Sequence, residues 1–361
     1  MFFYFLIFFF VALQAILLEI KPLQKTERSF SSQWPVRWFF TFIFFTSIIG
    51  LRHEVGGDWL TYLVDLDQSY EMTLSDAIFD NQPLYSLVKI FSIQFNSIYV
   101  MNSILGICFT YGLFIFCRHQ PRPWLALLIS ISYLIVVVSM GYSRQAASIG
   151  FFMIALTYLE RGSKSLFLYW CFLAILMHNS AIIFAPMILF LNITRVSYLI
   201  GASILSLLGI YFIFSSDLIQ DIMVGFIGAE YNSAGAGVRL AMNGVAAFLF
   251  LVFRNRFRLT EYQKKVWLWF SIYCFLLITL LFIIPSSTII DRLGLFWIPL
   301  QIFVFSRLPD VLGSSATSKI FFVLSIIFFY FLILFVWLVY SDNSYAWMPY
   351  QFYPWSLITG K

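Results

Sequence analysis

Charged residues are scarce in this chain. Asp, Glu, Lys and Arg together make up 11% of its 361 residues, whereas about 25% is usual for soluble domains. So little charge excludes an ordinary soluble globular protein. Charge blocks, Gly/Ser-rich linkers and low-complexity stretches are also missing, so we expect one domain covering residues 1–361. We expect no nucleic-acid partner.

Cysteine and histidine are equally sparse. The four cysteines (Cys108, Cys117, Cys171 and Cys274) fall in apolar stretches without metal-ligand spacing. We interpret them as reduced packing residues. The three histidines are scattered, which argues against a zinc site, so we expect no metal and no other cofactor.

The first twenty residues contain no basic residue, and Lys21 is the first. A secretory signal peptide needs a positive start and a small-residue cleavage site. We therefore expect this segment to be a retained membrane anchor.

Apolar runs are abundant instead. Apolar residues make up 61% of the chain and aromatic residues 21%, in repeated runs long enough to cross a hydrocarbon core of about 30 Å. This pattern predicts an all-α polytopic membrane protein with about 12 transmembrane helices. The expected spans lie near residues 1–20, 37–51, 97–117, 124–140, 145–159, 166–178, 179–192, 198–215, 239–253, 266–285, 292–305 and 320–340.

Basic residues gather on one side of these spans. The short connections on that side, with the span-end residue Arg37, hold 16 of the 22 Lys and Arg residues. By the positive-inside rule that side is cytoplasmic, so both termini should be periplasmic. The connections are 21–36, 118–123, 160–165, 193–197, 254–265 and 306–319.

The parity of the spans decides how residues 166–192 should fold. One long helix here would move the basic connection 254–265 to the outside, against the charge rule. We therefore expect a hairpin. Its first limb of about 13 residues reaches only about 20 Å at 1.5 Å per residue, so His178, Asn179 and Ser180 at its apex should lie in a recess below the outer surface.

The outer loop 52–96 contains a further helical pattern near 80–96. Leu84, Val88 and Phe91 recur at helical spacing, while Lys89 and Ser92 occupy the other face. The pattern predicts an amphipathic helix lying in the membrane interface.

Four arginines depart from the orientation signal because they face outward. Arg144, Arg239 and Arg292 each lie at the expected outer start of a helix that runs inward. A helix N-terminus combined with an arginine fork is a good receptor for phosphate. With Arg52, these residues suggest a pyrophosphate-like ligand.

The alternative is that each of these arginines pairs with a local carboxylate or a lipid phosphate. Glu54 or Asp58 lies near Arg52 in the sequence, and Asp291 precedes Arg292.

Two loops offer candidate bases. The outer loop beginning at Arg52 carries Glu54 and Asp58 around a glycine pair, and either carboxylate could take a proton from a hydroxyl. The alternative is an ordinary turn with solvated charges. His178 is the one histidine expected inside the membrane zone, where polar residues are functional by default, or else it is a hydrogen-bonded structural residue.

The outer C-terminal tail is rich in aromatic residues, which suits either a sugar-stacking platform or an interfacial aromatic belt. The residues concerned are Tyr345, Trp347, Tyr350, Phe352, Tyr353 and Trp355.

Three motifs together resemble those of EpsG-like membrane proteins, which belong with the Wzy-type polymerases of O-antigen, capsule and exopolysaccharide. The run Gly50–Trp59 followed by Tyr62 resembles the first outer-loop motif of that family. Ser143-Arg144-Gln145, together with Ala174 through Ala181, resembles the central signature, and Asp291-Arg292 the later one. The resemblance implies these motif residues: Arg52, Gly56, Asp58, Tyr62, Arg144, Gln145, His178 and Arg292. Arg239 rests on its placement alone, and Glu54 is a weaker base candidate than Asp58.

The resemblance implies a glycosyltransferase of the bacterial inner membrane that acts at the periplasmic face. It would transfer a growing glycan from undecaprenyl pyrophosphate to the next lipid-linked repeat unit, without a metal ion. A transporter or flippase for the same lipid-linked oligosaccharides explains the arginines equally well. Polysaccharide O-acetyl transfer is a third reading, for which His119 is the only cytoplasmic histidine. The repeat unit, the linkage, the stereochemistry, the oligomeric state and the binding of a chain-length regulator stay open.

Overall fold

The structure is a computed structural model that describes residues 1–19, 34–184, 187, 201, 235–283 and 287–359. Every named element within these ranges is a helix. The first part of the chain contains α1 (Phe2–Glu19), α2 (Val36–Gly50), α3 (Trp59–Gln68), α4 (Leu74–Phe79), α5 (Pro83–Ile93), α6 (Ile98–Arg118), α7 (Pro123–Ser130), η1 (Ile131–Ser139), α8 (Ser143–Glu160), α9 (Lys164–Met177) and η2 (Asn179–Phe184). The second part contains α13 (Ala236–Phe253), η3 (Arg254–Arg256), α14 (Glu261–Ile283), α15 (Ser287–Leu295), α16 (Ile298–Leu312), α17 (Ala316–Tyr340), η4 (Asp342–Trp347) and α18 (Tyr353–Thr359).

Six helices within the described ranges are long and apolar enough to cross a membrane. They are Phe2–Glu19, Ile98–Arg118, Ala236–Arg256, Glu261–Ile283, Ile290–Leu312 and Ala316–Tyr340. Shorter apolar helices accompany them at Val36–Gly50, Pro123–Ser139 and Lys164–Met177. The chain is therefore a polytopic membrane protein. Of the expected span 179–192 only residues 179–184 and 187 are described, and of the span 198–215 only Gly201 is described, so the total of twelve stays a prediction.

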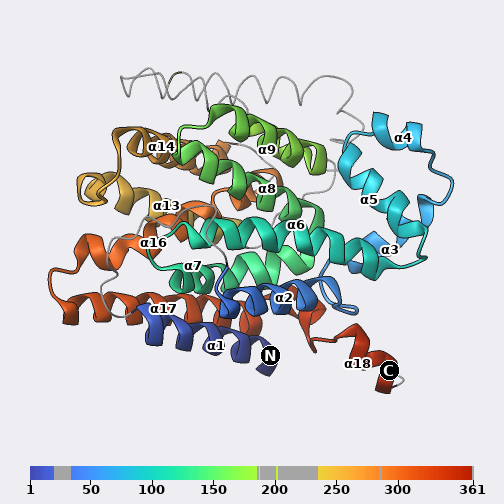
Figure 1. The fold of residues 1–361 in the computed structure, drawn as a ribbon, viewed down its shortest axis with the longest axis horizontal. Coiled ribbons are helices and arrows are strands. Elements are labelled where there is room, and N and C mark those ends of the chain that lie inside the picture. The colour runs from blue at the N-terminus through green and yellow to red at the C-terminus, as the bar shows by residue number, and fades with distance from the viewer. Residues whose placement is uncertain (20–33, 185–186, 188–200, 202–234, 284–286, 360–361) are drawn as a thin grey trace.

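The long helices run side by side, so their connections gather at two opposite ends of the bundle (Figure 1). We call one the inner end; it holds Glu19, 118–123, 160–164, 254–261 and 307–319. We call the other the outer end; it holds 51–58, 140–145, His178, 235–239, 287–292 and 341–353. Among the described residues, the connections that we expected on the cytoplasmic side lie together at the inner end. The connections that we expected on the periplasmic side lie together at the outer end.

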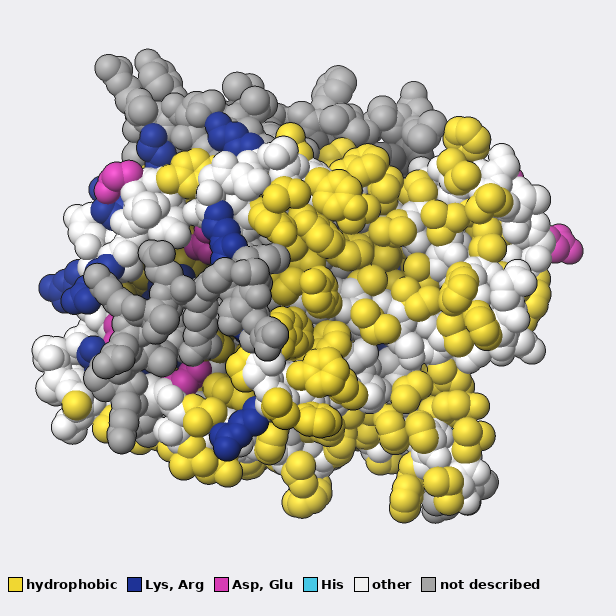
Figure 2. All heavy atoms as spheres, in the orientation of Figure 1, with side chains coloured by type: hydrophobic (Ala, Val, Ile, Leu, Met, Phe, Trp, Pro, Cys, Tyr) yellow, Lys and Arg dark blue, Asp and Glu magenta, His cyan; other side chains and the backbone are white. Residues whose placement is uncertain are grey.

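Two buried charged residues at the inner end, Glu19 and Arg122, have partners within the protein. The Glu19 carboxylate accepts the backbone N–H of Trp124 at 2.9 Å, which caps the start of α7. Arg122 donates to both oxygens of Asp310, and Lys319 lies 3.0 Å from the same carboxylate. Figure 2 shows Lys and Arg side chains gathered mainly toward this end, while apolar side chains cover much of the middle.

The central helix α8 packs against α6 at glycines. A Cβ on Gly112 would lie 2.0 Å from the carbonyl oxygen of Gly150, and a Cβ on Gly150 would lie 2.6 Å from that of Cys108. Such contacts let two helix backbones approach closely, as small residues do in membrane bundles. They fix the depth of α8, whose outer end begins Ser143-Arg144-Gln145.

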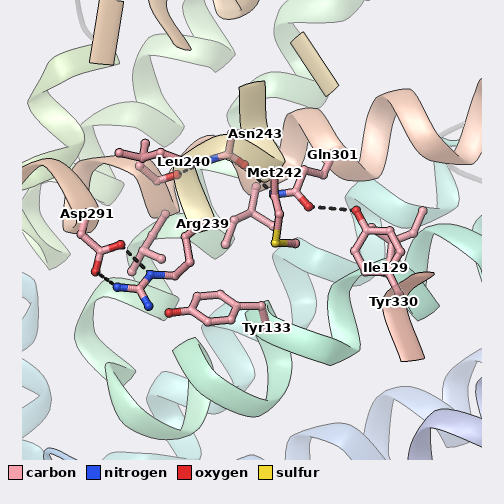
Figure 3. A pocket seen from close by; sticks show the side chains of 12 residues that line it. Ile129, Tyr133, Arg239, Leu240, Met242, Asn243, Asp291, Gln301 and Tyr330 are labelled. Atoms are coloured by element: carbon pink, nitrogen blue, oxygen red, sulfur yellow. Dashed lines mark hydrogen bonds and ion pairs between the residues drawn. The ribbon is translucent and has the colours of Figure 1, made fainter. Parts of the chain in front are cut away.

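A chain of buried polar side chains connects three other helices. Tyr330 on α17 donates to Gln301 on α16 at 2.8 Å, and Gln301 donates to Asn243 on α13 at 2.6 Å. Figure 3 shows these side chains in a row beside Arg239 and Asp291. Because an unpaired polar group is costly in an apolar interior, this chain fixes the register of the three helices.

The predicted span 292–305 is divided in the structure. α15 ends at Leu295 and α16 begins at Ile298. Arg292 therefore lies in the last turn of α15 and also near the start of the candidate span Ile290–Leu312, which continues through this turn. This agrees with the expectation that Arg292 lies near the start of a span, although α15 itself begins earlier, at Ser287.

The amphipathic pattern near 80–96 does form a helix, α5, with its polar stripe turned toward the protein. Lys89 is buried and lies 3.0 Å from Asp65, and Ser92 is buried as well. Phe91 and Phe95 are exposed on the other side. This arrangement agrees with a helix whose apolar face meets lipid, although its position in a membrane stays a prediction.

Candidate active site

The loop between α2 and α3 has its shape imposed by Gly56. This residue has a φ of +110°, and a Cβ on it would lie 2.0 Å from the carbonyl oxygen of Met140. Only glycine fits such a conformation at such a distance. Its backbone N–H donates to Ala346 at 2.8 Å, so the C-terminal tail also holds the loop. Asp58 then stands at the start of α3.

The C-terminal tail is packed onto this loop rather than left as an open platform. Trp347 is buried beside Gly57 and Gly141, and its indole N–H donates to the Val136 carbonyl at 2.8 Å. Phe352 forms a backbone bridge with Arg52. The tail therefore helps to build the scaffold of the site.

Arg52 lies at the base of the loop and its guanidinium is used within the protein. Its Nε donates to the Val55 carbonyl at 3.0 Å and one terminal nitrogen to the Ile49 carbonyl at 2.6 Å. The other terminal nitrogen donates to Asn102 at 3.1 Å and Ser143 at 2.7 Å. Burial lowers the pKa of Arg52 to about 10, which still leaves it charged at neutral pH. These bonds give Arg52 a scaffold position, joining the loop to α6 and α8, instead of the expected ligand contact.

Asp58 is half-buried and is surrounded by cations at longer range. No hydrogen bond or ion pair reaches its carboxylate from any residue that the structure describes. Burial raises the pKa of Asp58, while the charges of Arg292, Arg144 and Arg52 act in the opposite direction. A buried carboxylate near several arginines but bonded to none of them is suited to accept a proton from a bound group.

Arg144, in the first turn of α8, is one of the arginines whose charge acts on Asp58. Its guanidinium lies over the ring of Tyr62, 5.7 Å from the centroid, and over that of Tyr85 at 4.9 Å. The Tyr62 hydroxyl accepts the backbone N–H of Arg144 at 3.3 Å. Among the described residues no carboxylate lies within ion-pair distance of Arg144.

Arg292 is the second arginine whose charge acts on Asp58. Its guanidinium lies over the ring of Tyr142, 5.6 Å from the centroid. The Gln145 amide donates to the backbone carbonyl of Arg292 at 2.5 Å, so Gln145 fixes the position of this residue. Across the part of the chain that the structure covers, no carboxylate forms an ion pair with Arg292 either.

His178 joins the same group from α9. The helix ends at Met177 because His178 is extended, with a φ of −158° and a ψ of 119°, and the short helix η2 follows. Residues 166–192 are therefore not one continuous helix, as the parity argument required. Arg144 and Arg292 are the two charges that act on the His178 ring, and the Ser180 backbone N–H donates to its Nδ1 at 3.3 Å.

A family model matches residues 36–352, and its description is the EpsG family. The match covers most of the chain, including every residue of the site described above.

The chain belongs to the EpsG family.

The predicted resemblance is thereby confirmed. No curated protein and no solved structure matches this chain. EpsG membership makes it a polysaccharide-related membrane protein and points to a glycosyltransferase-like activity.

Two of the expected site residues of this EpsG family protein, Arg239 and Glu54, do not join the group around Asp58. Arg239 donates from Nε and a terminal nitrogen to the two oxygens of Asp291, at 2.6 Å and 2.5 Å. Its guanidinium also lies over the ring of Tyr133, 5.5 Å from the centroid. Glu54 is exposed on the loop, in the left-handed region with a φ of 51°, and its charge acts on Tyr99.

Two aromatic residues of the EpsG site were missed by sequence reasoning. Tyr85 underlies Arg144, and its hydroxyl donates to Asp65 at 2.7 Å. Tyr142 underlies Arg292. Tyr142 immediately precedes the Ser143-Arg144-Gln145 motif, which was an available signal, whereas nothing in the pattern of α5 distinguished Tyr85. Within the described ranges no group of three or more His, Cys, Asp or Glu side chains is arranged to hold a metal ion.

Proposed function

We propose that this protein is a polysaccharide polymerase of the Wzy type, acting at the periplasmic face of a bacterial inner membrane. It transfers a growing glycan from undecaprenyl pyrophosphate to a hydroxyl of the next lipid-linked repeat unit. The observation that carries the proposal is the grouping of Arg144, Arg292, Asp58 and His178 at the outer end. Two arginines without carboxylate partners among the described residues are suited to a di-anionic ligand.

The arginines supply the electrostatic part of the reaction. The bond from the anomeric carbon to the pyrophosphate oxygen breaks, and negative charge grows on that oxygen as it leaves. Arg144 and Arg292 stabilise this charge from two sides. We assign to them the role that a metal ion has in other transferases, so the proposed enzyme is metal-independent.

Asp58 supplies the proton transfer. Its carboxylate takes the proton of the acceptor hydroxyl while the hydroxyl oxygen forms the new bond to the anomeric carbon. The neighbouring arginines help to keep Asp58 ionised despite its burial. His178 is the other candidate base, because its imidazole lies near the same two arginines and a neutral imidazole can accept a proton.

Three further residues of the sequence prediction take supporting places. Tyr62 and Gln145 hold Arg144 and Arg292 through the contacts described above. Arg52 holds the loop that carries Asp58. Glu54, being exposed on that loop, is left out of the proposed mechanism.

The test is the glycan profile of cells that lack this protein. A polymerase predicts single repeat units at the outer face in place of long chains, and complementation with the wild-type gene should restore them. A complete loss of outer-face glycan would instead favour a flippase. Complementation with Asp58→Asn separates the two further, because a flippase needs no general base and would still export repeat units that become polymerised.

A further inference from the structure

Asp291 and Arg292 are neighbours on α15 but face different parts of the protein. Arg292 lies against Tyr142, beside the proposed active site. Asp291 lies against Arg239 on α13, in the two-bonded arrangement that guanidinium and carboxylate groups favour (Figure 3). The two side chains of this ion pair are largely buried, with exposed fractions of 17% for Arg239 and 12% for Asp291.

The ion pair is one of several contacts that dock α15 onto its neighbours. The Asn243 amide donates to the Gly294 carbonyl at 2.9 Å. A Cβ on Gly294 would lie 2.7 Å from a methyl group of Leu240, so α13 and α15 are in close contact. From the other side, the Gln145 amide donates to the Arg292 carbonyl. The position of Arg292 is therefore set by α13 and α8, and not by α15 alone.

We propose that Arg239 is a positioning residue, which acts through Asp291 to keep Arg292 directed at the site. This inference rests on the proposed function of Arg292 and departs from the expectation that Arg239 itself holds the ligand. The ion pair between Asp291 and Arg239 holds α15 against α13, so the face of α15 that carries Arg292 stays turned toward Tyr142. The Arg292 guanidinium is thereby held where a pyrophosphate can meet it.

A double-mutant cycle in the polymerisation assay distinguishes the two roles. Arg239→Gln breaks the ion pair that docks α15 and leaves the Asp291 charge buried, so it should lower kcat/KM by about 10- to 100-fold, as displacement of a catalytic group by about 1 Å can do. Asp291→Asn in the same chain removes that buried charge, so the double variant should recover much of the loss. If Arg239 binds the ligand directly, the double variant will be no better than Arg239→Gln, which contradicts the inference.

Thiol labelling provides a readout that does not depend on catalysis. A cysteine introduced as Arg292→Cys is labelled from the outer side in membranes, and the parent chain with its four native cysteines gives the background. Adding Arg239→Gln should change the labelling rate several-fold, because α15 loses its ion pair to α13. Arg254→Gln, at the exposed inner end of the same helical segment, is the matched control and should leave the rate unchanged.

A second probe, Ser287→Cys at the start of α15, serves if the first variant does not fold. An unchanged labelling rate at both positions would overturn the positioning role even if the protein is a polymerase. Polymer formation is measured in the chain that keeps Arg292. A changed labelling rate together with no polymer from that chain would support the positioning role and reject the proposed function, so the two failures are distinguishable.

Discussion

Arg122 at the inner end and the two arginines of the proposed site at the outer end differ in their counter-ions. At the inner end Arg122 is fully buried and its guanidinium contacts Asp310, which also meets Lys319. At the outer end Arg144 and Arg292 lie over aromatic rings, with no carboxylate paired to either among the described residues. A buried charge that has a counter-ion in the protein needs no further partner. A buried charge without a counter-ion costs free energy unless a ligand supplies the opposite charge.

This contrast supports the proposal that the outer end binds the anionic ligand. Arg52 shows that burial alone is not the signal, since it lies at the outer end and has most of its N–H groups satisfied by the protein. Arg52 also lies over an aromatic ring, that of Trp59, and its charge also acts on Asp58. What distinguishes Arg144 and Arg292 is that, among the described residues, neither guanidinium is bonded to a backbone carbonyl or a carboxylate. The predictions below test this difference between the two ends, from the largest expected effect to the smallest.

Asp58→Asn should give the largest effect. The substitution keeps the size of the side chain but removes the proton acceptor, and a general base typically contributes about 10²- to 10⁴-fold. Chain extension should therefore be lost while lipid-linked repeat units still bind. The measurement is polymer length in a reconstituted assay, with His178→Ala tested in parallel as the other candidate base. If both variants still produce full-length glycan, neither residue is the base and the proposed mechanism is wrong.

Arg144→Lys and Arg292→Lys should give the next largest effect. Lysine keeps the charge but cannot make the planar two-bonded contact of a guanidinium, so we expect kcat/KM to fall by about 10- to 100-fold, which corresponds to the loss of about 1.4–2.7 kcal/mol of stabilisation. Arg122→Lys is the matched inner-end control and should leave kcat/KM per folded molecule unchanged. Equal losses at the two ends would remove the distinction between them.

The acidic side of the pH–rate profile should respond to Arg292→Gln. The active enzyme needs ionised Asp58, so the rate falls as the pH drops through its pKa, which burial raises and Arg292 lowers. Removing the Arg292 cation should raise that pKa, so the rate falls at a higher pH than in the wild type. Residual activity measured across pH will check this. An acidic limb that stays at the wild-type pH would show that Asp58 does not govern it.

Arg122→Gln should change stability and leave activity nearly unaffected. It removes a charged hydrogen-bond donor from Asp310, for which a loss of roughly 1–3 kcal/mol in the free energy of unfolding is typical. Lys319 remains beside Asp310, so the carboxylate is not left alone. Thermal unfolding in detergent measures the loss, and the specific activity of the folded fraction should match the wild type. A large fall in specific activity would mean that the inner end takes part in the reaction.

Much of the fold was predictable because hydrophobic length carries the information in a membrane protein. The expected spans near 97–117, 124–140 and 320–340 match helices at Ile98–Arg118, Pro123–Ser139 and Ala316–Tyr340. The break at His178 followed from parity and limb length. The turn between α15 and α16 did not, because residues 292–305 read as one apolar run. Pro299, in the first turn of α16, was an available signal for it.

The grouping of the candidate residues was more predictable than their individual contacts. The motifs and the expected outward-facing charges made Asp58, Arg144, His178 and Arg292 candidates, and the structure places them near one another, while their roles stay a prediction. They could not show that Arg52 is satisfied by backbone carbonyls, because those bonds depend on how the loop folds around Gly56. Tyr85 could not be found either, since its contact with Arg144 joins elements far apart in the sequence.

The central claim is that Arg144 and Arg292 form the pyrophosphate site, and binding of a short polyprenyl pyrophosphate to the purified protein tests it most directly. The wild type, Asp58→Asn and Arg122→Gln should all bind the probe, with Asp58→Asn at least as tight as the wild type because a negative charge has been removed from the site. The double variant Arg144→Gln with Arg292→Gln should show no measurable binding while unfolding at a temperature near that of the wild type. Binding of the probe by the double variant with wild-type affinity would contradict the account.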